Sequence, residues 1–276
     1  MTILYNGVKI QNDMFGDSKL FMSINKEHVY NEVYPSDGLD DYVSLYFKAE
    51  NLSNKPQPMT ICPDGYFKLI IQLWNGKTTA YFLTGIWANE IDIVIPPKVT
   101  TYGIKFKIIA SEIIFKREIA SILNSVEQKR TDYLGIDKVD FGAFEDVVKQ
   151  LESVLLSKLP AKEQIRANRI RLSQFLYSNH EDIQAREVAQ QIHWSQREIN
   201  RYLNKYIGIS LKKYLNIRKC YRSYLTITEG EFFPEKGFFD QAHFIREVKK
   251  HTGQTPTALY KGQNDQFIQL RNIKKL

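Results

Sequence analysis

The sequence has 276 residues, of which 43% are hydrophobic, and it carries 38 Lys and Arg against 31 Asp and Glu, a net charge of +7. This length allows one large or two medium-sized domains, and two is the better expectation. An apolar run of about 18 residues is absent, as is a charged-then-apolar leader at Met1, which excludes a membrane span and a secretory signal and predicts a cytoplasmic protein.

The positive charge is confined to the C-terminal part of the chain. Residues 161–276 hold 21 Lys and Arg against 11 Asp and Glu, a net +10, whereas residues 1–160 hold 17 against 20, a net −3. A basic balance alone suits nucleic acid, an anionic membrane or simple solubility. Together with the change of pattern described below, it predicts two domains, 1–160 and 161–276.

The N-terminal part has a residue pattern typical of β-strands. Short runs rich in Val, Ile, Tyr and Phe lie between turn residues, at 42–47, 67–73, 80–83, 91–95 and 102–108. Asn75 and Gly76 separate two of these runs and predict a two-residue hairpin turn. We therefore expect a small antiparallel β barrel or sandwich.

After Ser111 the hydrophobic period becomes helical. The pattern predicts helices over 112–124 and 141–159, with Pro160 closing the second, and then a helix that opens in the charged segment 161–171 and runs to Tyr177. The first two helices would form a connector between the sheet and the basic C-terminal part. The predicted fold class is α+β, with an all-α C-terminal domain.

Residues 186–206 predict a short helix, a turn and a second helix. Ser195 and Glu198 form an S-x-x-E capping box at the start of the second helix, and Ile199 and Leu203 repeat on its buried face. Gly208 should end this helix, and a longer helix should follow from Leu211 to about residue 227.

Residues 237–259, reading GFFDQAHFIREVKKHTGQTPTAL, predict another amphipathic helix with fixed ends. Asp240 is its expected N-cap, Phe244 and Val248 its buried positions, and Gly253 its left-handed C-terminal residue. Thr255 and Pro256 then start a further helix.

This run resembles the C-terminal signature of the AraC/XylS family of bacterial transcription regulators, roughly G-F-x-D-x-S/A-x-F-x-R-x-F-K-x-x-x-G-x-T/S-P. That family carries two helix-turn-helix units joined by a long helix, and residues 184–206 and 211–227 resemble the first unit and the joining helix. The resemblance covers about residues 163 to 260. It implies a sequence-specific DNA-binding regulator, controlled by a small-molecule effector or by oligomerisation through its N-terminal domain.

The resemblance also implies roles for individual side chains. Arg bonds guanine, Asn and Gln bond adenine, and Lys holds phosphates with little sequence information. By position, the base-contacting residues are Arg197, Asn200, Arg201, Gln241 and Arg246. The expected phosphate-contacting residues are Ser195, Asn204, Lys205, Lys212, Lys213, His243, Lys249 and Lys250.

One departure from the family pattern concerns the second unit. Only four residues separate Phe232 from Gly237, too few for the two-turn scaffold helix that family members place there. We expect the second recognition helix to be less firmly supported than the first, and its base specificity to be weaker.

The N-terminal part has a weaker resemblance to the sensor-like domains that precede such DNA-binding domains. The matching residues are Cys62-Pro63-Asp64-Gly65, Gly85 and the segment 103–106. The resemblance implies a cupin-like barrel that binds an effector or contacts a partner.

Other chemistry finds little support in the sequence. His28 is the only histidine of the N-terminal part, so we expect no metal, and without P-loop, G-x-S-x-G or G-x-G-x-x-G motifs we expect no cofactor and no enzyme. Asp64 could pair with Lys68 as acid and base, although a turn-capping role is the simpler interpretation. Cys62 and Cys220 are expected to be reduced and structural, with a sensor thiol at Cys62 as the alternative.

The predicted partners are therefore double-stranded DNA and an organic effector that is apolar in part. RNA polymerase is a candidate partner, and both a homodimer and a monomer are compatible with the sequence. The alternative function is a ligand-binding or enzymatic barrel whose degenerate second unit leaves it an accessory regulator with weak DNA affinity. That alternative predicts a blocked second helix and a deep polar pocket.

Overall fold

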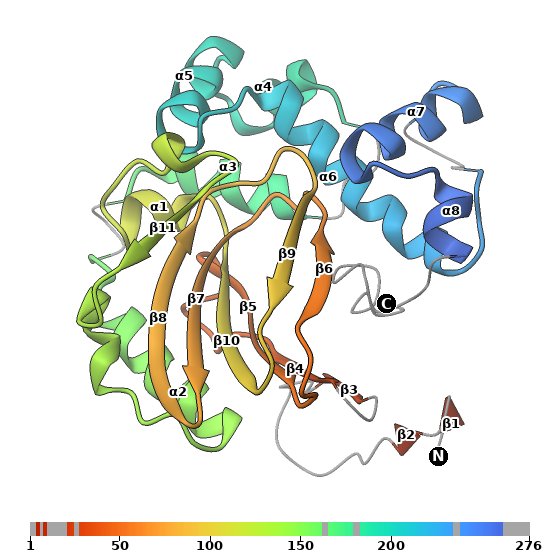
Figure 1. The fold of residues 1–276 in the computed structure, drawn as a ribbon. Helices are drawn as coiled ribbons and strands as arrows, with labels where there is room; N and C mark the ends of the chain where they lie inside the picture. Colours follow the sequence, from red (N-terminus) through yellow and green to blue (C-terminus); the bar gives the residue numbers. More distant parts are fainter. Residues whose placement is uncertain are drawn as a thin grey trace.

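The structure is a computed structural model that describes residues 4–5, 8–9, 21–24, 28–161, 165–178, 183–233 and 238–261. An antiparallel sheet is formed by the N-terminal part, and the helices of the C-terminal part lie along one end of it (Figure 1). The expected α+β class, with a β-rich part followed by a helical part, is confirmed.

The main sheet has seven antiparallel strands in the order β11-β8-β7-β10-β5-β4-β3. These strands are β3 (Phe21–Ile24), β4 (His28–Val33), β5 (Val43–Asn51), β7 (Phe67–Trp74), β8 (Lys77–Thr84), β10 (Val99–Phe106) and β11 (Val126–Lys129). Separate pairs are made by β6 (Gln57–Ile61) with β9 (Ile91–Ile95), and by β1 (Leu4–Tyr5) with β2 (Val8–Lys9). All five predicted strands are present.

Within the described residues the main sheet does not close on itself, because β11 and β3 are its two edges. The expectation of a barrel is therefore wrong, and the arrangement is an open sheet with the β6–β9 pair beside it (Figure 1). The predicted hairpin turn is confirmed. Asn75 and Gly76 join β7 to β8 with φ of 49° and 73°, the left-handed values that a tight hairpin turn of this kind requires.

The two faces of the main sheet differ in character. Phe67 and Phe106 stack with ring centroids 5.3 Å apart on one face, which packs against α2 (Phe144–Leu156) through Tyr102 and Phe144. The opposite face, which we call the inner face, carries Lys68 opposite Lys105 in the β7–β10 register. Strand alternation thus places an apolar core on one side and charged side chains on the other.

The connector differs from its prediction. The single helix expected over 112–124 is wrong: the chain forms α1 (Ile109–Ile113) and the 3-10 turn η1 (Ala120–Ile122), because Lys116 and Asn124 adopt positive φ values that interrupt a helix. Strand β11 and the 3-10 segment η2 (Tyr133–Lys138) follow, both unpredicted. Helix α2 is shorter than the expected 141–159.

The C-terminal helices agree closely with the sequence pattern. They are α3 (Ala167–Tyr177), α4 (Ala185–Ile192), α5 (Gln196–Ile207), α6 (Leu211–Thr228), α7 (Gln241–Thr252) and α8 (Pro256–Lys261). Helix α3 begins within the charged segment 161–171 and ends at Tyr177, as expected, and residues 162–164 lie outside the described part. In the part of the chain that the structure describes, none of the helices is long and apolar enough to cross a membrane.

Candidate nucleic-acid interface

The first helix pair has the Ser195 cap that the sequence predicts, and a left-handed end to α4 that the sequence pattern did not predict. His193 takes a left-handed conformation, with φ of 51°, that ends α4, and Ser195 starts α5. The Ser195 hydroxyl accepts the Glu198 N–H at 3.3 Å and donates to the Glu198 carboxylate at 2.6 Å, a hydrogen bond that lowers the pKa of Glu198. Since Ile199 and Leu203 are fully buried, they determine which face of α5 points to solvent.

That exposed face carries four of the thirteen residues predicted to contact DNA. Arg197, Arg201, Asn204 and Lys205 are all exposed, and Arg201 has only a long contact of 3.9 Å with Glu198. These side chains gather on the face of α5 that lies opposite its buried stripe.

Asn200 differs from this group. Its amide oxygen accepts the Leu211 N–H at 2.9 Å and so caps the first turn of α6. The structure therefore gives Asn200 a role in holding α5 against α6, and its predicted base contact stays a prediction.

Helix α7 is also capped as predicted. Asp240 accepts the His243 N–H at 2.6 Å, Gly253 is left-handed with φ of 69°, and Thr255 accepts the Ala258 N–H at 3.2 Å. Gln241, Arg246, Lys249 and Lys250 are exposed, whereas His243 is half-buried, with Nδ1 accepting the Phe239 N–H.

Helix α6 joins the two capped helices. Its first turn exposes Lys212 and Lys213, and Ser210 accepts the Lys213 N–H at 3.3 Å.

No scaffold helix precedes α7 in the described residues 229–233 and 238–240, and four residues, 234–237, lie outside the described part. The back of α7 is nevertheless fully covered. Phe244 and Val248 belong to a buried cluster with Tyr224 and Ile227 of α6, Leu259 of α8, and two cysteines, Cys220 of α6 and Cys62 of the sheet part. The sheet part thus contributes to the core under α7.

Both cysteines are reduced and buried, as the structural interpretation predicts. Burial raises the pKa of the Cys220 thiol to about 12 and also raises that of Cys62. Such thiols remain protonated near neutral pH, which argues against a sensor thiol at Cys62.

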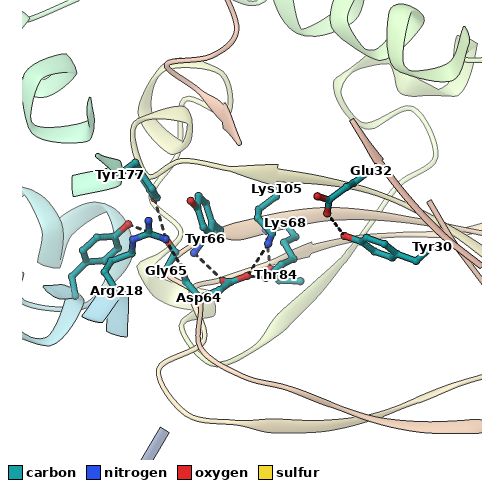
Figure 2. A network of polar contacts seen from close by, with 11 residues as sticks. Tyr30, Glu32, Asp64, Gly65, Tyr66, Lys68, Thr84, Lys105, Tyr177 and Arg218 are labelled. Carbon is teal, nitrogen blue, oxygen red and sulfur yellow. Dashed lines mark hydrogen bonds and ion pairs between the residues drawn. The ribbon is translucent and has the colours of Figure 1, made fainter. Parts of the chain in front are cut away.

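A buried ionic cluster lies where the sheet meets the helices (Figure 2). One carboxylate oxygen of Asp64 accepts the Tyr66 N–H at 3.1 Å, and the other lies 3.0 Å from Lys68 Nζ and 3.4 Å from Lys105 Nζ. Asp64 therefore caps its turn, as the simpler interpretation of the sequence predicts, and it also forms an ion pair with Lys68. Burial alone would raise the pKa of Asp64, but the two lysines and the hydrogen bonds lower it.

The turn that contains Asp64 is anchored to the helices. The Gly65 carbonyl accepts hydrogen bonds from the hydroxyls of Tyr177 in α3 and Tyr214 in α6, each at 2.9 Å, and Arg218 of α6 donates to the Asp64 carbonyl at 3.0 Å. The Arg218 guanidinium also lies 4.9 Å from the centre of the Tyr66 ring, a cation–π contact. No local pattern in the sequence predicted these contacts.

A group of three or more side chains that could hold a metal ion does not occur among the described residues, and the side chain of His28 lies outside them.

Comparisons with known proteins find one family model and several solved structures. A family described as "Domain of unknown function (DUF6597)" matches residues 31–128. A search of curated sequences found no match. Among solved structures, ToxT from Vibrio cholerae O395 bound to (E)-4-(8-methylnaphthalen-1-yl)but-3-enoic acid is 13% identical, with a TM-score of 0.40, over 87% of this chain and 100% of that chain. Unsaturated fatty acid bound wild-type ToxT from Vibrio cholerae strain SCE256 is 8% identical, with a TM-score of 0.41, over 86% and 95%.

Proposed function

We propose that this chain is a sequence-specific transcription regulator of the AraC/XylS type, with residues 161–276 as its DNA-binding domain and residues 1–160 as its sensor or dimerisation domain. The observation that carries the proposal is the pair α5 and α7. Each is a 12-residue helix with a side-chain N-cap, a left-handed glycine at its C-terminus, a buried apolar back and an exposed basic front. Helix α6 joins them, as one long helix joins the two units of that family.

The base-reading residues in this proposal are Arg197 and Arg201 of α5, with Gln241 and Arg246 of α7, which would enter successive major-groove segments on one face of the duplex. Asn200 acts by positioning α5. The phosphate-contacting set is Ser195, Asn204, Lys205, Lys212, Lys213, His243, Lys249 and Lys250.

The exposed front of α7 favours this function over the accessory-regulator alternative. That alternative requires a blocked second helix, but Gln241, Arg246 and Lys249 are exposed. The buried back of α7 also argues against the weaker support that we expected from the missing scaffold helix.

An effector would bind on the inner face of the sheet. Lys68 and Lys105 are both mostly buried there, and Lys105 Nζ lies 5.2 Å from the centre of the Tyr66 ring. Cations beside an aromatic ring suit an organic molecule with an apolar body and an anionic end. This chemistry agrees with the predicted effector.

The test is selection of bound sequences from random duplex DNA by the full chain, followed by titration of variants on the selected operator. Arg201→Ala and Arg246→Ala should each cost about 1–3 kcal/mol of binding free energy and relax preference at one base pair. Arg130→Ala is the matched control, because it removes the same charge from an exposed site of the sheet domain. It should change neither the binding free energy nor the base preference. Failure to select any sequence would contradict the proposal.

A further inference from the structure

Two segments of the sheet domain, residues 85–90 and 118–125, are bonded into one unit, which we call the platform. The Gly85 N–H donates to the Ser125 carbonyl at 3.0 Å, and the Asn124 N–H donates to the Ile86 carbonyl at 3.0 Å. The Asn124 side chain adds a third bond, because its amide oxygen accepts the Ala88 N–H at 2.7 Å. A β-carbon at Gly85 would overlap the Ile122 carbonyl, so only glycine allows this close approach.

The C-terminal end of α5 sits on one half of the platform. The Ile119 N–H donates to the Tyr206 carbonyl at 2.8 Å, which satisfies a carbonyl in the last turn of the helix. Gly208, the residue that ends α5, packs so closely on Ala120 that an added β-carbon would lie 3.3 Å from its Cα. Lys205 and Glu118 are 3.6 Å apart but more than half exposed, so the backbone contacts matter more.

The C-terminal end of α7 sits on the other half. His251, in the last turn of α7, is only 2% exposed, and its imidazole lies against the backbone of Ala88. The next contact is at Gly253, where an added β-carbon would lie 3.0 Å from the Glu90 carboxylate. Cys62 of the sheet domain also contributes to the contact with α7, because it belongs to the same buried cluster as Phe244 and Val248.

We infer that the platform is a second link between the two recognition helices, besides α6, and that it sets their spacing on DNA. The inference rests on the proposed function. These contacts are made with the C-terminal ends of α5 and α7, and Arg197, Arg201, Gln241 and Arg246 remain exposed. Docking of the sheet domain therefore supports DNA binding, and a shift between residues 85–90 and 118–125 alters the operator spacing that the protein accepts.

The experiment compares the spacing preference of full-length variants. Asn124→Gly removes the bond to Ala88, and because Asn124 has φ of 54°, glycine keeps the backbone conformation. The matched control is Asn75→Gly, which makes the same change at a positive φ of 49° in the β7–β8 turn. Gly85→Ala, which forces the two segments apart, is the second variant. Thermal unfolding establishes that each variant is folded.

Each protein is titrated on the selected operator and on versions with one or two base pairs inserted or deleted between the half-sites. One base pair shifts the half-sites by about 3.4 Å, and we expect the wild type and Asn75→Gly to lose affinity about tenfold. Asn124→Gly and Gly85→Ala should lose less than about threefold, or prefer a new spacing.

Two results would overturn the inference while leaving the proposed function intact. If both variants keep the wild-type spacing profile, α6 alone sets the spacing. If Asn124→Gly binds every operator more tightly than the wild type, the platform inhibits binding. Failure to select any operator from random DNA would overturn the inference and the proposed function together.

Discussion

The buried Asp64 cluster gives the sharpest prediction of stability. Asp64→Asn keeps an oxygen that can accept the Tyr66 N–H but removes a negative charge that lies within 3.4 Å of both Lys68 and Lys105. At an effective dielectric constant of about 20, each lysine attracts the carboxylate by about 5 kcal/mol before desolvation is subtracted. Removal of one partner from a buried ion pair costs about 3–5 kcal/mol in net stability, so we expect a loss in that range.

The assay is urea unfolding at pH 7, followed by tryptophan fluorescence and far-UV circular dichroism. A loss of about 3–5 kcal/mol should lower the midpoint by about 1 M or more without changing the slope. The pKa of Asp64 is lowered in the folded state, so its contribution is present above its unfolded pKa of 3.8 and is lost as pH falls through the folded value. The difference between wild type and variant should therefore shrink below about pH 4.

Lys68→Met in the Asp64→Asn background is the control, because it removes one of the two lysines left without a counter-charge. The double variant should be more stable than Asp64→Asn alone. Equal midpoints for wild type and Asp64→Asn at pH 7 would refute the reasoning, since they would show that the carboxylate charge contributes no net stability.

Three further predictions concern single side chains. Lys249→Ala should weaken binding to all DNA sequences alike and reduce the salt slope by about 0.9; a change of sequence preference with an unchanged slope would contradict a phosphate contact. Burial lowers the pKa of His251 below 6.5, so wild-type stability should fall by up to about 1.4 kcal/mol per pH unit as pH drops below 6.5, and His251→Gln should abolish this slope in urea titrations across pH 5–7. Cys62 and Cys220 should react with a thiol reagent at pH 8 only after unfolding, and rapid reaction of either in the native protein would show that its burial has been misjudged.

The helix caps and the hairpin turn could be predicted because they depend on neighbours within a few residues. Ser195 with Glu198, Asp240 with His243, and the turn at Asn75 are local hydrogen-bonding or backbone arrangements, and each has its own residue signature. The repeat of Phe244 and Val248 likewise fixes the exposed face of α7 before any partner is known.

The tertiary structure alone decided how these pieces meet. Lys105 joins Asp64, Asn200 caps α6, and Cys62 enters the core beneath α7 through contacts between residues far apart in the chain. The open edges of the sheet and the bond between Ala88 and Asn124 are of the same kind. Such contacts produce no periodic pattern in the sequence. Any residue of suitable size and polarity could make them once the fold has brought the two segments together.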